Sequence, residues 1–222
     1  LYSIAGRFSS FITLFTTCFN MAWQEMSYSR EAQKQTNQGE FYTTALNSYI
    51  KFLCMGLLML IPAISVIFPI MINESYADAK QLVPYYLLAT IVSCISSFFG
   101  NIFTAIKKNN VLFYTTVAGS VVNVVSVHLL LPIVGVQGAS IALFLGFMVN
   151  NTIRAYLLKK EIQVSIDLKF IVAWAIVYIG VSYIYLHANA IINVLTVFVG
   201  GLLTLFVFRK ELKEILGTIK NR

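Results

Sequence analysis

The chain has few charged residues: they make up 11% of its 222 residues, whereas hydrophobic residues make up 58%. A soluble domain has about 25% charged residues, so this chain lacks the polar surface that would keep it in water. Its nine acidic residues against 16 Lys and Arg give a net charge of +7. The basic residues lie in short clusters between long uncharged runs, which is typical of membrane topology and argues against nucleic acid as a partner.

The sequence also lacks the motifs of catalysis and of cofactor binding. It has no Walker loop, no Gly-rich phosphate fingerprint and no zinc spacing. Cys18, Cys54 and Cys94 lie in apolar runs without pairing or ligand spacing, and His128 and His187 are far apart. No carboxylate falls within the long apolar runs, so a paired general acid and base is missing there. We therefore expect no enzyme activity, no cofactor and no metal.

Seven long apolar stretches are present instead. A helix needs about 20 apolar residues to cross ~30 Å of hydrocarbon, and helices satisfy their own backbone hydrogen bonds in lipid. The sequence predicts an all-α, polytopic membrane protein with seven transmembrane helices. These helices are predicted at residues 2–24, 44–72, 82–106, 111–131, 137–158, 168–186 and 190–208.

The basic residues predict an orientation for this bundle. Fourteen of the 16 would lie on one side of the membrane, and only Arg7 and Lys80 would not. The positive-inside rule makes that side cytoplasmic, together with residues 107–110 and the C-terminal tail. Residues 73–81 and 187–189 would then lie on the outer side.

The first predicted helix, residues 2–24, carries a polar stripe. At about 100° per residue, its polar and small residues share one face. They are Ser3, Gly6, Arg7, Ser10, Thr13, Thr17, Asn20 and Gln24. Such residues either line a cavity or let helices pack closely. A cation within a span costs about 2.5–3.5 kcal/mol, which favours a cavity for Arg7 unless it only holds a helix end through carbonyls or headgroups.

The later stretches differ from one another. Small polar residues in 82–106 and 111–131 favour close helix packing, with Asn123 a possible cavity residue. In 137–158, Arg154 follows Gly146 and Asn150 at one-turn spacing, and we expect its side chain to extend to the headgroups. The last two stretches have no charged residue in their cores and are predicted to face lipid.

Several of these segments resemble one family as a set. Residues 2–11 (YSIAGRFSSF) and 19–25 (FNMAWQE) are similar to the second helix of the C-terminal lobe of Wzx-type polysaccharide flippases. These belong to the multidrug/oligosaccharidyl-lipid/polysaccharide exporter superfamily. Residues 97–100 (SFFG), 104–108 (TAIKK) and 132–139 (PIVGVQGA) resemble further recurrent patches of that family, and the glycines of the last predict a tight turn.

The resemblance implies a MATE-like fold, with two six-helix lobes facing each other across a central cavity. Residues 1–160 would form helices two to six of the second lobe. Residues 161–208 would be an accessory transmembrane pair, and 209–222 a basic cytoplasmic tail. The N-terminal lobe would be missing from this chain.

The resemblance also implies a function. Family members move undecaprenyl-pyrophosphate-linked oligosaccharides, such as O-antigen repeat units, across the bacterial inner membrane by alternating access, alongside polysaccharide polymerase machinery. Related lipid II flippases carry a cavity arginine at the position of Arg7, which would bind the pyrophosphate. Lys51, Lys107 and Arg154 would fit a basic cytoplasmic mouth. The alternative is a multidrug or cation antiporter of the same superfamily, which intramembrane carboxylates would favour.

Overall fold

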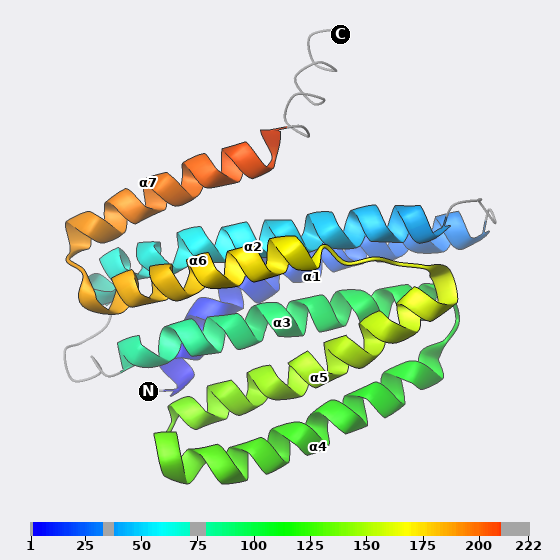
Figure 1. The fold of residues 1–222 in the computed structure, drawn as a ribbon, viewed down its shortest axis with the longest axis horizontal. Helices are drawn as coiled ribbons and strands as arrows, with labels where there is room; N and C mark the ends of the chain where they lie inside the picture. The colour runs from blue at the N-terminus through cyan, green and yellow to red at the C-terminus, as the bar shows by residue number, and fades with distance from the viewer. Residues whose placement is uncertain (1, 33–37, 72–78, 210–222) are drawn as a thin grey trace, which may run out of the picture.

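The computed structural model describes residues 2–32, 38–71 and 79–209, and throughout these residues the regular structure is helical. The helices are α1 (Tyr2–Ala32), α2 (Gln38–Met71), α3 (Ala79–Ala105), α4 (Asn109–Val134), α5 (Gln137–Ile162), α6 (Leu168–His187) and α7 (Ala190–Val207) (Figure 1). The predicted all-α fold is confirmed. Each predicted stretch matches one helix, although α1 and α2 extend beyond the boundaries predicted from hydropathy.

Six helices, α2 to α7, are long and apolar enough to cross a membrane. A polytopic membrane protein is therefore the architecture that the structure supports. Helix α1 is not one of the six, so its predicted span stays a prediction. It also runs past residue 24 to Ala32 and so takes in Glu25, a carboxylate that the predicted boundary left outside.

Consecutive helices run antiparallel, so their connections collect at two ends of the bundle (Figure 1). The α3–α4 connection, which contains Lys107 and Lys108, lies at one end, where α5 also ends with Lys159 and Lys160 and the α5–α6 connection begins. The α4–α5 and α6–α7 connections lie at the other end. The basic clusters are thus grouped as the charge pattern requires, while the side of the membrane that each end faces stays a prediction.

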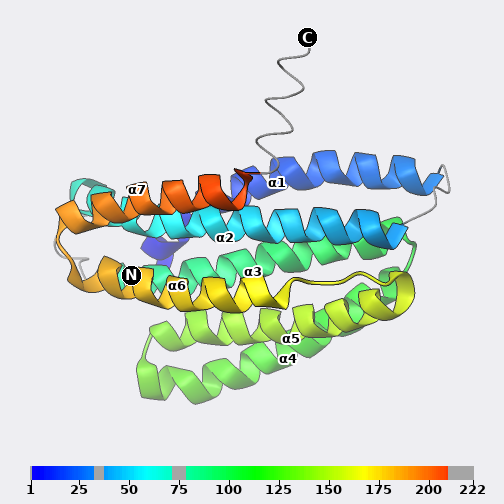
Figure 2. The same cartoon turned by 45° about the horizontal axis from the view of Figure 1, so that its top comes forward.

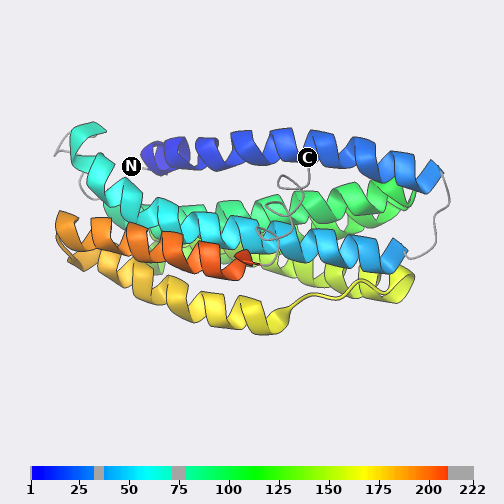
Figure 3. The same cartoon turned by 90° about the horizontal axis from the view of Figure 1, so that it is seen from above.

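The core is built around α2 and α3, which hold most of the fully buried large side chains. Helices α1 and α5 pack on α3, α4 packs on α5, and α6 and α7 pack on α2. Figure 3 shows α1 along one side of the bundle and the α6–α7 pair on the opposite side. Helices α4, α6 and α7 bury few of their side chains, as expected of helices that contact lipid.

A tight turn joins α4 to α5. Gly135 ends α4 with a φ of 63°, a left-handed conformation that glycine adopts without strain. Gly138 lies so close to α4 that a Cβ there would be 2.8 Å from the carbonyl oxygen of Leu130. The run from Pro132 to Ala139 therefore folds as the predicted tight turn and brings α4 and α5 into direct contact.

Candidate functional site

Helix α1 is anchored to the bundle along one face. Phe8, Thr16 and Trp23 are buried: Phe8 stacks on Phe68 of α2, and the Thr16 hydroxyl lies 3.5 Å from Cys94 Sγ of α3. The Trp23 ring lies 5.1 Å from Phe98 of α3 and 5.1 Å from Phe41 of α2, centroid to centroid. This aromatic packing fixes the rotation of α1 and so decides which of its side chains remain outside.

The polar face of α1 points away from this packing. Ser10, Thr13 and Thr17 are exposed, and their hydroxyls donate to carbonyl oxygens one turn earlier at 3.2, 3.1 and 2.7 Å. Because these bonds lie within α1, the three hydroxyls hold no neighbouring helix. Their remaining lone pairs can accept hydrogen bonds from another molecule.

Arg7 lies on the same exposed face. Among the side chains that the structure describes, none forms an ion pair or a hydrogen bond with it. A guanidinium has five N–H donors in a planar fork that matches carboxylate and phosphate oxygens. Arg7 is therefore available to an anion from outside this chain. The side chain of Ser3 lies outside the described residues.

The C-terminal end of the predicted stripe behaves differently. Gln24 Nε2 donates to Asn101 Oδ1 on α3 at 2.7 Å, so this residue joins two helices. Asn20 is half-buried. The stripe is thus divided: the part around Arg7 is open, whereas Gln24 has the packing role that the sequence left as the alternative.

Arg154 of α5 does not extend to the headgroups, and that expectation was wrong. It is only 6% exposed and is surrounded by hydroxyls and a carbonyl. Its Nε donates to Thr115 Oγ1 at 2.9 Å, and its Nη2 to Thr116 Oγ1 at 3.1 Å, both on α4. Its Nη1 donates to the carbonyl and hydroxyl oxygens of Ser96 on α3, at 2.7 and 3.0 Å. One buried guanidinium therefore ties three helices together.

The three basic residues of the predicted mouth thus occupy different surroundings. The Lys51 ammonium lies 5.8 Å from the centroid of the Phe170 ring on α6. Lys107 is exposed in the α3–α4 turn with a φ of 59°, and its neighbour Lys108 forms an ion pair with Glu161. Because Arg154 is buried, it cannot line an open mouth with the other two.

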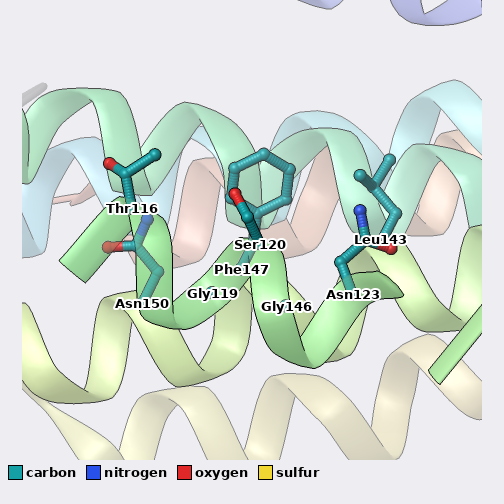
Figure 4. Close-up of a pocket in the computed structure, with 8 residues that line it drawn as sticks. All are labelled: Thr116, Gly119, Ser120, Asn123, Leu143, Gly146, Phe147 and Asn150. Carbon is teal, nitrogen blue, oxygen red and sulfur yellow. The ribbon is translucent and has the colours of Figure 1, made fainter. Parts of the chain in front are cut away.

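A polar cleft of about 160 Å³ lies between α4 and α5 (Figure 4). It is lined by Thr116, Gly119, Ser120, Asn123, Leu143, Gly146, Phe147 and Asn150. A Cβ on Gly119 would lie 2.8 Å from the Gly146 carbonyl oxygen, and one on Gly146 would lie 2.7 Å from that of Gly119. The small residues here allow close helix packing, which confirms that prediction for Gly119.

Two amides of the cleft have an unused acceptor. Asn150 is 5% exposed, and neither its Oδ1 nor that of Asn123 has a hydrogen-bond partner among the described residues. An unpaired buried amide oxygen is costly in an apolar environment. The cleft is therefore able to accept hydrogen bonds from hydroxyl or amine groups.

Sequence reasoning placed Asn123 among the possible cavity residues but missed Asn150. The signal was the four-residue spacing of Gly146, Asn150 and Arg154, which puts all three on one face of α5. That spacing alone does not reveal which helix the face meets. Comparisons of the chain with protein-family models, curated proteins and solved structures find no match.

Proposed function

We propose that this protein translocates undecaprenyl-pyrophosphate-linked oligosaccharide repeat units across the bacterial inner membrane by alternating access. The observation that carries the proposal is Arg7, an exposed cation without a described partner on the polar face of α1. The resemblance of residues 2–11 and 19–25 to the second lobe of polysaccharide flippases supports it. In this proposal α1 is a seventh transmembrane helix, and its polar face lines a cavity between two lobes.

The chemistry of the α1 face suits such a substrate. A pyrophosphate carries at least two negative charges and cannot enter hydrocarbon without compensation. The planar guanidinium of Arg7 can bind two oxygens of the pyrophosphate at once. Ser10, Thr13 and Thr17 donate their own protons to the helix backbone, so they are left as acceptors for sugar hydroxyls.

Replacement of Arg7 in the complete protein tests this role. We expect Arg7→Ala to abolish glycan export in a flippase-null strain while membrane abundance stays near normal. Arg7→Lys should retain part of the activity, because lysine keeps the positive charge but lacks the paired N–H donors of the guanidinium. Phe15→Ala, at an exposed apolar position of the same helix, is the matched control and should export normally.

Other outcomes of this experiment are equally informative. If Arg7 only holds a helix end, Arg7→Ala would lower the protein level and Arg7→Gln would restore it. Normal export from a stably expressed Arg7→Ala protein would end the proposal. Gradient-driven efflux of drugs or cations without any glycan export would instead favour the antiporter.

The orientation that the proposal needs can be tested separately. In a cysteine-free background, a cysteine at position 189 should react with a membrane-impermeant thiol reagent in intact cells. A cysteine at position 110 should react only after the inner membrane is opened. The reverse pattern would contradict the cytoplasmic C-terminus.

A further inference from the structure

A second and larger cavity lies where α6 meets the rest of the bundle. It has a volume of about 480 Å³ and is lined by residues of α2, α3, α5 and α6, among them Ile50, Phe99, Met148 and Trp174. Its wall carries few polar groups: Asn151 Nδ2 donates to Val92 O at 2.9 Å and Thr152 Oγ1 to Met148 O at 2.7 Å, while Asn151 Oδ1 has no partner among the described residues. The cavity is therefore apolar almost throughout.

Helix α6 is held away from α5 by bonds to other helices. Trp174 Nε1 donates to the Cys54 carbonyl of α2 at 2.8 Å, and the Tyr178 hydroxyl to the Pro84 carbonyl of α3 at 2.7 Å. The Trp174 and Tyr178 rings stack with centroids 5.0 Å apart. Helix α6 runs along α2, as Figure 2 shows. Because α6 is fixed to α2 and α3, it cannot close the space without breaking these bonds.

An apolar space of this size does not stay empty in a membrane. Interiors are packed to crystal density, and a void loses the dispersion contacts of its lining. Water would find few polar partners there. A hydrocarbon chain is the available filler for an apolar cavity of about 480 Å³.

The end of the cavity near the start of α6 is basic. Lys51 follows the wall residue Ile50 and lies over the Phe170 ring, and the exposed Lys169 follows the wall residue Leu168. The nearby carboxylate of Asp167 accepts a hydrogen bond from the Phe170 amide at 3.1 Å and caps α6. Two lysines and one capping carboxylate thus lie in this part of the chain, a local excess of positive charge that favours a negative headgroup.

We propose that this cavity binds one hydrocarbon chain of an anionic phospholipid, whose phosphate is held by Lys51 and Lys169. The site is separate from the Arg7 face and from the α4–α5 cleft. It does not depend on glycan transport, and a failure of either proposal leaves the other standing.

Native mass spectrometry of the purified protein tests the chain-binding part, with phosphatidylglycerol and phosphatidylcholine of identical chains added separately. Ala175→Phe, on the cavity wall, should weaken phosphatidylglycerol binding by about tenfold or more because the ring occupies the chain's place. Ala173→Phe, at an exposed position of the same helix, is the matched control and should bind normally. Ala155→Phe fills the cavity from α5 and should reproduce the loss if Ala175→Phe fails to fold.

The headgroup part is tested by removing the charges. The unmodified protein should prefer phosphatidylglycerol, and the double variant Lys51→Gln/Lys169→Gln should bind both lipids about equally. Lys80→Gln is the matched control, since its ammonium lies 5.3 Å from the Tyr185 ring centroid at the other end of the bundle. Equal binding of the two lipids by the unmodified protein, or unchanged binding by both cavity-filling variants, would overturn the proposal.

Discussion

Helix α1 and the α4–α5 hairpin each carry an arginine within a polar stripe, yet the two arginines have opposite surroundings. Arg7 is exposed and has no described partner, whereas Arg154 is 6% exposed and donates four hydrogen bonds to α3 and α4. The polar groups around Arg7 bond within their own helix. Those around Arg154 belong to neighbouring helices.

The difference comes from the backbone beside each stripe. In the hairpin, Gly119 and Gly146 let the two helices touch, so polar side chains nearby reach across to one another. In α1, large aromatic side chains such as Trp23 make the contact with α2 and α3, and the polar face is turned outward. The stripe around Arg154 is thus an interface beside a glycine pair, whereas the part of the α1 stripe around Arg7 is an open face.

The largest effect on stability should come from Gly146→Leu. A side chain there meets the Gly119 carbonyl oxygen at 2.7 Å, so α4 and α5 must separate and Arg154 loses partners. We expect a loss of about 3 kcal/mol or more, measured by thermal unfolding in detergent. Gly180→Leu is the matched control, because no atom lies within 4 Å of a Cβ at that helical position. A similar loss in both variants would refute the proposed role of the glycine pair.

Arg154→Ala should have the next largest effect. It removes four hydrogen bonds, each of about 0.6 kcal/mol in a membrane protein, together with the packing of the side chain, so we expect a loss of about 2–3 kcal/mol. Arg154→Lys should recover only part, since one ammonium cannot span Ser96, Thr115 and Thr116. An Arg154→Ala protein that unfolds at the unmodified temperature would show that the guanidinium does not hold the helices together.

Gln24→Ala should have a smaller effect. It removes one hydrogen bond between α1 and Asn101 of α3, with an expected loss of about 0.6 kcal/mol. The double variant Gln24→Ala/Asn101→Ala gives the coupling between the two side chains. Strictly additive losses would indicate that the bond contributes nothing to the attachment of α1.

The smallest effect on stability should come from Arg7→Ala. An exposed side chain without partners contributes little to the folded state, so the unfolding temperature should stay within the scatter of repeated measurements. This measurement is independent of the export assay and tests the comparison of the two arginines directly. A destabilisation as large as that of Arg154→Ala would remove the distinction between them.

Much of the fold could be predicted from the sequence because hydropathy and helix length are local properties. Six predicted spans reappear as helices of sufficient length and apolarity, and the glycines of residues 132–139 form the expected turn. The surroundings of Arg154 could not be predicted, because four-residue spacing identifies a shared face but not the helix that covers it. Gln24 was assigned to the open stripe for the same reason, since its partner Asn101 is distant in sequence.

The four bonds of Arg154 also bear on the order in which the protein can be made. Ribosomes synthesise α3 and α4 before α5, so every acceptor of this guanidinium is already in the chain when Arg154 emerges. An arginine alone in a nascent span costs about 2.5–3.5 kcal/mol on insertion. The three-helix contact lowers that cost only if α3 and α4 remain beside the translocation machinery until α5 arrives. Only residues 106–108 and 135–136 separate the three helices, so we expect them to insert into the membrane together.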